Sequence, residues 1–337
     1  MFDISNFGIK VFDEKIMKKK LPSPIYKKWM DAMHNKTCTL DRTTADAIAH
    51  AMKEWAVEQG CTHYCHWFQP LTGTTAEKHD AFVGMRDGEP ILKFSGKNLI
   101  QGEPDASSFP NGGLRSTFEA RGYTYWDCSS PVFIRGNTLC VPTIFVGFKG
   151  ETLDMKWPLL KSIDAISEQA VRIVNAFGDK EVTSVTPSIG LEQEYFLVDR
   201  DDFLKREDLV MTGRTLFGAM PSKGQELETH YFGAIPERVQ KFMEDVNIQL
   251  WELGIYAKSE HNEVAPAQFE LAPIFGPANI AIDQNAIIMD VLQRTALRHN
   301  LVCLLHEKPF KGVNGSGKHN NWSITTDDGI NLLDTAF

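Results

Sequence analysis

A pair of glutamates inside an apolar segment constrains the fold more than any other feature. Ser188–Val198 reads SIGLEQEYFLV, which is typical of a buried β-strand except for Glu192 and Glu194. Successive strand side chains point to opposite faces, so these carboxylates share one face about 7 Å apart. Like charges so placed repel unless a cation lies near them. Taken alone, a polar strand face in solvent explains the pair better.

A second carboxylate pair lies in Ala257–Pro273, AKSEHNEVAPAQFELAP. Glu263 and Glu270 have small or apolar neighbours on both sides. Their odd separation would send them to opposite faces of one unbroken strand. Pro266 predicts a break or bulge that brings both to one side. The alternative is a solvated edge strand, which the apolar neighbours make slightly less favoured.

A glycine-rich loop precedes His319 in Lys311–Thr325, KGVNGSGKHNNWSIT. Gly312–His319 matches the phosphate-binding pattern G-x-x-x-x-G-K, except that His319 replaces the final serine or threonine. That motif needs a strand before it and a helix after it. Pro309 interrupts the preceding residues and no helix is predicted next, so we reject a P-loop. A lone histidine after a loop is more often structural than a ligand.

Together the three segments offer four glutamates and one histidine. Oxygen ligands with one imidazole favour Mg²⁺ or Mn²⁺ over zinc. More carboxylates than one ion needs indicates two ions. Paired hard cations are common in phosphoryl transfer, where they neutralise phosphate oxygens.

The periodicity along the chain predicts an α+β protein in three parts. Residues 1–60 read as an irregular start with helices, and residues 61–150 as a small β-rich domain. Residues 151–337 alternate long amphipathic helices with strands, as expected of a catalytic α/β body. The predicted helices span 45–59, 158–177, 237–253 and 279–305, and the main predicted strands 62–68, 138–145 and 188–198.

Composition narrows the function and the compartment. The 337 residues carry a net charge of −9, which argues against nucleic-acid binding as the main role. The chain shows no secretion signal and no apolar run of bilayer length. We therefore expect a cytoplasmic protein with six reduced cysteines and no membrane partner. The cluster Cys61–His66 predicts a strand with core cysteines rather than a zinc site.

At these residues the sequence resembles the glutamine synthetases, and most closely type III, which has a long N-terminal region. The matching stretches are Gly190–Phe196, Asn262–Glu270 and Asn314–Ser323, in the family's order, together with Cys61–Asp80 of the N-terminal region. The resemblance covers most of the chain. It implies a β-grasp-like domain over 61–150 and a curved antiparallel sheet with flanking helices over 151–337.

The resemblance also implies a cation ligand set. Glu192 and His319 correspond to ligands of the cation on the ATP side. Glu194, Glu263 and Glu270 correspond to ligands of the second cation. Mg²⁺ or Mn²⁺ is therefore expected, with ATP as a substrate.

The remaining family positions concern the substrates. Asn314 and Gly315 correspond to the loop that binds glutamate, and Asn321 and Ser323 to positions near the nucleotide. Asp105, in DASSFPNGG, corresponds to the aspartate that binds ammonium and removes its proton in a neighbouring subunit's site, although Ala106 replaces the family glycine. The resemblance thus implies a ring-type homo-oligomer with shared active sites.

The implied reaction joins ammonia to the side-chain carboxylate of L-glutamate through a γ-glutamyl phosphate formed from ATP. Two alternatives stay open: a γ-glutamyl-amine ligase on the same scaffold, and a truncated, non-catalytic paralogue. The family's flap glutamate, its remaining ATP-side glutamate and its catalytic arginines have no counterpart before Phe337. We expect the chain to hold roughly half of a type III subunit.

Overall fold

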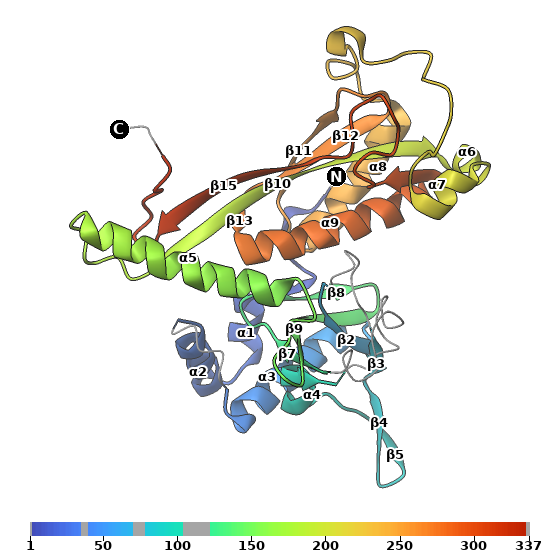
Figure 1. The fold of residues 1–337 in the computed structure, drawn as a ribbon. Helices are drawn as coiled ribbons and strands as arrows, with labels where there is room; N and C mark the ends of the chain where they lie inside the picture. The colour runs from blue at the N-terminus through green and yellow to red at the C-terminus, as the bar shows by residue number, and fades with distance from the viewer. Residues whose placement is uncertain (1, 35–39, 70–77, 104–121, 335–337) are drawn as a thin grey trace. The chain divides into compact units, whose positions relative to one another are not determined.

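The computed structural model describes residues 2–34, 40–69, 78–103 and 122–334 (Figure 1). They form two compact units. One is Gly8–Ile166, and the other joins Ser167–Phe337 to Met1–Phe7. Helices and mostly antiparallel strands build both units, so the predicted α+β class is confirmed. The three-part division into 1–60, 61–150 and 151–337 stays a prediction.

The Gly8–Ile166 unit combines a mixed sheet with helices. Seven of its described strands form one sheet in the order β1-β8-β9-β2-β3, with β7 beside β9 and β6 beside β7, and β4 and β5 pair separately. All pairs are antiparallel except β2 with β9. Its elements are α1 (Glu14–Lys20), α2 (Ser23–His34), α3 (Arg42–Glu58), α4 (Gly96–Ile100), β1 (Val11–Phe12), β2 (His63–Trp67), β3 (His79–Ala81), the hairpin β4 (Val83–Arg86) with β5 (Glu89–Leu92), β6 (Gln101–Gly102), β7 (Gly122–Trp126), β8 (Val132–Arg135) and β9 (Thr138–Gly147).

Helix α3 has a capped N-terminus and an apolar face that packs into the core of this unit. Asp41 ends the preceding segment and accepts a hydrogen bond from the Thr44 amide, which caps the helix. Ile48, Met52 and Trp55 recur on one helix face, and all three are buried in one cluster with strand residues of β8 and β9. The predicted helix and its apolar face are confirmed.

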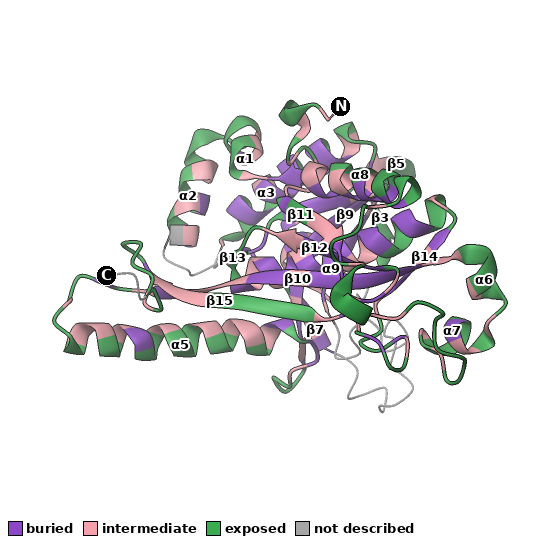
Figure 2. Cartoon of the chain, turned by 90° about the horizontal axis from the view of Figure 1, so that it is seen from above, coloured by how far each residue is buried: buried purple, intermediate pink, exposed green. Residues whose placement is uncertain are grey.

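The second unit is built around one long strand, β10 (Val185–Asp199). Its described strands form a six-stranded sheet in the order β11-β12-β10-β13, and β14 and β15 also pair with β10. Figure 2 shows β10 largely buried and β15 beside it largely exposed. The other elements are α6 (Arg200–Leu204), α7 (Glu207–Thr212), α8 (Glu237–Glu252), α9 (Ala278–Arg298), the short helices Ile4–Asn6 and Glu226–Glu228, β11 (Ala257–Asn262), β12 (Gln268–Pro273), β13 (Gly276–Pro277), β14 (Leu301–Leu304) and β15 (Lys318–Thr326), while α5 (Lys156–Ala176) begins in the first unit and ends here.

Two expectations from the sequence are wrong. The helix predicted to reach Leu305 ends at Arg298 instead, because Asn300 adopts a left-handed backbone and Leu301–Leu304 pairs with β10. A short apolar run fits a helix and a strand equally well, and its pairing with β10 decides. The other error concerns the cysteines, since Cys128 is disulfide-bonded, whereas Cys61, Cys65, Cys140 and Cys303 are buried thiols outside any disulfide.

No helix within the described residues combines the length and the apolarity needed to cross a membrane.

Candidate metal centre

Strand pairing brings the predicted acidic residues together across β10. Glu194 lies opposite Glu270 of β12, and Glu192 lies opposite His319 of β15. Directly opposed residues of antiparallel strands have neighbouring side chains on the same face. Because Glu192 and Glu194 alternate with Gln193, the carboxylates and the imidazole converge on one face of this sheet.

The second carboxylate pair shares that face because the chain turns back on itself. β11 and β12 form a hairpin, in which the Glu263 amide donates to the Gln268 carbonyl at 2.9 Å and Ala267 has a positive φ of 61°. The predicted break near Pro266 is therefore a tight turn. Glu263, just before the turn, and Glu270, after it, lie on the same side.

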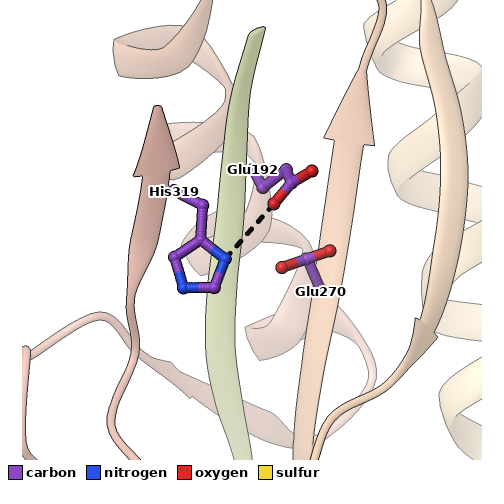
Figure 3. Close-up of side chains that lie close together, drawn as sticks. All are labelled: Glu192, Glu270 and His319. Carbon is purple, nitrogen blue, oxygen red and sulfur yellow. Dashed lines mark ion pairs between the residues drawn. The ribbon is translucent and has the colours of Figure 1, made fainter. Parts of the chain in front are cut away.

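The first ligand group contains Glu192, Glu270 and His319. Each offers one ligand atom, and these atoms all lie within 4.8 Å of one another. His319 Nδ1 is 3.3 Å from Glu192 Oε2, and its Nε2 is 3.8 Å from Glu194 Oε1. Figure 3 shows the three side chains pointing toward one another from β15, β10 and β12. Carboxylates around an imidazole match the donors expected for Mg²⁺ or Mn²⁺.

A second group contains His261, Glu263 and Glu270, again with one ligand atom each within 4.8 Å. Glu270 belongs to both groups. His261 was missed in the sequence because only carboxylates and the loop histidine were weighed. The signal was present, since alternation along β11 places His261 on the face of Glu263, two residues later.

Burial makes these carboxylates costly to ionise without a cation. Glu263 and Glu270 are 8% and 5% exposed. Burial raises the pKa of Glu263, and the neighbouring Glu194 carboxylate raises it further. Burial likewise raises the pKa of Glu270, followed by the charges of Glu192 and Glu263. A divalent ion would offset both effects, so these residues fit such an ion.

The glycine-rich loop is tied to the same centre. The Gly317 amide donates to Glu194 Oε2 at 2.6 Å, and Gln268 Nε2 donates to the same oxygen at 3.0 Å. A Cβ at Gly315 would meet the Glu307 backbone carbonyl, so only glycine fits there. Asn314 exchanges two hydrogen bonds with Gln225, at 2.5 and 3.3 Å.

A pocket of about 900 Å³ opens over this loop. The pocket is lined both by acidic residues of the centre and by the loop. Its lining residues include Glu194, Glu263, Asn314, Gly315, Ser316, Gly317 and His319. Four of the site residues predicted from the sequence therefore share this pocket with His319. The volume is within the range of small-molecule sites.

The lining residues named above do not include three other predicted site residues, Asn321, Ser323 and Asp105. Asn321 donates to Glu192 Oε1 at 2.8 Å, so it touches the centre. Ser323 is four residues beyond His319 on β15 and donates to Asn331. Asp105 lies outside the described residues, so its predicted role stays a prediction.

Comparison with known families identifies the chain. Residues 4–162 match the model described as glutamine synthetase type III N terminal, and residues 168–336 match the glutamine synthetase catalytic domain. The chain belongs to the glutamine synthetase family. The resemblance noted in the sequence is confirmed.

Several family members are close relatives. The chain is 51% identical to a type-3 glutamine synthetase of Dictyostelium discoideum over 99% of its own length and 45% of the relative's. It is 56% identical to a glutamine synthetase of Bacteroides fragilis over 96% and 44%. The chain thus spans somewhat less than half the length of these curated relatives.

Two solved structures share the fold. A cryo-electron microscopy structure of Plasmodium falciparum glutamine synthetase superposes with a TM-score of 0.60 at 17% identity, over 85% of this chain and 55% of the other. A structure titled as a GmaS/ADP complex gives a TM-score of 0.56 at 18% identity, over 84% and 57%. At such identities the likeness shows the fold alone.

Proposed function

We propose that this chain supplies the N-terminal region and the acidic part of the active site of a type III glutamine synthetase. The enzyme joins ammonia to the side-chain carboxylate of L-glutamate through a γ-glutamyl phosphate made with ATP. The observation that carries the proposal is the convergence of four glutamates and one histidine from β10, β12, β15 and the β11–β12 turn.

In this proposal the acidic residues hold Mg²⁺ or Mn²⁺. Glu192 and His319 hold a cation on the ATP side, and Glu194, Glu263 and Glu270 hold a second. When bound, such cations neutralise phosphate and carboxylate oxygens and align them. The burial of Glu263 and Glu270 suits this role, because partly dry carboxylates attract a cation more strongly than solvated ones.

The loop supplies the glutamate subsite. Asn314 and Gly315 would bind the α-carboxylate and amino group of glutamate, and Gln225 holds Asn314 in place. Gly317 and Gln268 donate to Glu194 and thereby join the loop to the cation ligands. Asn321, bonded to Glu192, and Ser323 further along β15 would face the nucleotide. Fixed positions of this kind favour reaction by holding the reactants in line.

The enzyme would act as a ring of identical subunits. Asp105 of one subunit would bind ammonium at a neighbour's site and remove its proton. An assembly that is dissociated into folded monomers should then lose activity, and an active monomer would contradict the role of Asp105.

The test uses the full-length protein and Mn²⁺-dependent γ-glutamyl transfer. Glu194→Gln and Glu263→Gln should each reduce transfer by at least about a hundredfold, because each removes a charged cation ligand. Glu244→Gln, on the exposed side of α8, is the matched control and should keep full activity. Near-normal activity in either site variant would overturn that residue's role. Preference for an organic amine over ammonia would instead favour a γ-glutamyl-amine ligase.

A further inference from the structure

His261 has no task in the function proposed above, although it stands among the cation ligands. It lies opposite Glu270 in the β11–β12 pairing, and it belongs to the second ligand group with Glu263. The ring of Tyr231 contacts it edge-on, with the two centroids 5.4 Å apart. The imidazole is therefore held on the face that carries the carboxylates.

One hydrogen bond of the His261 ring determines which of its two nitrogens carries the lone pair. His261 Nδ1 lies 2.9 Å from the backbone carbonyl oxygen of Asn262. A carbonyl oxygen only accepts, so Nδ1 must carry the hydrogen. In the neutral ring the lone pair is then on Nε2. Metal-bound histidines commonly donate their other ring hydrogen to a backbone carbonyl in this way.

The free nitrogen faces a carboxylate. His261 Nε2 lies 3.1 Å from Glu270 Oε1, and Glu263 Oε1 lies 3.6 Å from the other ring nitrogen. An imidazole lone pair and an ionised carboxylate repel at this distance, so either a proton or a metal cation must lie between them. Two adjacent ligands of an octahedral ion, each about 2.1 Å from the metal, are about 3.0 Å apart. The observed separation matches that spacing.

We propose that His261 binds, through Nε2, the divalent cation held by Glu263 and Glu270. Each of the two cation positions then contains one imidazole, His319 at one and His261 at the other. This inference rests on the proposed function, because it assumes that both positions take a cation. Imidazole nitrogen favours Mn²⁺ over Mg²⁺ more than a carboxylate oxygen does, so His261 would bias this position toward Mn²⁺.

The test is Mn²⁺ binding by the full-length protein labelled with ¹⁵N-histidine. Pulsed electron paramagnetic resonance of the wild type should show two distinct ¹⁵N couplings when two Mn²⁺ are bound. His261→Gln should remove one coupling and lower Mn²⁺ affinity at one position by at least about tenfold. Its Mg²⁺ affinity should fall less. His50→Gln, exposed on α3, is the control and should change neither quantity.

The outcomes separate the two proposals. If two Mn²⁺ bind but the wild type shows a single histidine coupling, or His261→Gln leaves binding unchanged, His261 is not a ligand and the proposed function stands. If Mn²⁺ does not bind to the wild type, the proposed function fails as well. The wild-type spectrum decides the matter even if His261→Gln does not fold.

Discussion

The two units treat buried charge in opposite ways. In the Gly8–Ile166 unit, Asp127 and Lys156 form an ion pair at 2.7 Å, with side chains only 4% and 3% exposed. Burial alone would raise the pKa of Asp127, but Lys156 and the Ser129 hydrogen bonds more than reverse this and lower it. In the β10 sheet, Glu263 and Glu270 face other carboxylates, and their pKa values are raised.

Under the proposed function, the difference separates a charge that serves structure from charges that serve cation binding. In a buried ion pair the two opposite charges compensate one another, so no bound ligand is required. A buried cluster of one sign is destabilising on its own and becomes favourable only when a ligand of opposite charge binds. If the sheet holds cations as proposed, it loses some folding stability in exchange for cation affinity, a trade-off that is common at functional sites.

Removing Lys156 should leave the first unit, like the second, with a buried carboxylate that has no opposite charge beside it. Lys156→Met leaves the Asp127 carboxylate buried without its cation, so the free energy of unfolding should fall by about 3–5 kcal/mol. Denaturant titration measures this. The double variant with Asp127→Asn should recover most of the loss. Lys205→Met, at an exposed pair, should change little. Equal losses in the single and double variants would show that packing rather than charge matters here.

Glu260 of β11 is a half-buried carboxylate that follows a different rule from the acidic cluster. Glu260 accepts a hydrogen bond from Asn247, but burial raises its pKa to about 7. The folded protein then holds a proton that the unfolded chain has released, so stability falls as pH rises from 4.5 to about 7. Glu260→Gln removes this slope and should stabilise the protein at pH 8 by up to about 3 kcal/mol.

Denaturant titrations at pH 5 and pH 8 test this directly. The Glu260→Gln gain should be small at pH 5 and full at pH 8, whereas Glu244→Gln should show no such difference. A gain that is equal at both pH values would mean that the charge of Glu260 is not the cause.

Local patterns in the sequence predicted several features of the acidic sheet and of helix α3. Alternation placed Glu192 and Glu194 on one face, and the odd spacing with Pro266 indicated a break before Glu270. Both rest on neighbouring residues, so no knowledge of distant contacts was needed. The apolar face of α3 was predictable for the same reason.

Features that depend on distant pairing were not predictable from local pattern. Glu192 meets His319 only because β15 pairs with β10, and here the family resemblance rather than periodicity joined them. Alternation along β11 could have placed His261 on the face of Glu263, but its position opposite Glu270 depends on the register of the hairpin. The end of α9 was misplaced because Leu301–Leu304 becomes a strand only beside β10.

Removing a charge from the acidic sheet should separate stability from binding. Burial and the neighbouring carboxylates raise the pKa of Glu270, so its ionisation costs stability as pH rises above 4.5. Glu270→Gln should therefore stabilise the metal-free protein at pH 8 and not at pH 4. It should also weaken Mn²⁺ binding about 10- to 100-fold, because Glu270 belongs to both ligand groups. Calorimetric titration with Mn²⁺ and thermal melts in a chelator measure the two effects, and a variant that loses both stability and affinity would contradict the trade-off.

The loss of an uncharged helix cap provides a reference for the stability cost of losing a buried charge. Ser95 caps α4, accepting from the Asn98 amide, while the Asn98 side chain accepts from the Ser95 amide. Ser95→Ala removes one partner of this half-buried pair and should cost about 1 kcal/mol, while Ser95→Thr should retain most of the cap. Denaturant titration compares the two variants. Because no net charge is involved, the cost should not vary between pH 5 and pH 8. A loss as large as that of Lys156→Met would mean that buried charge is not what distinguishes the costly positions.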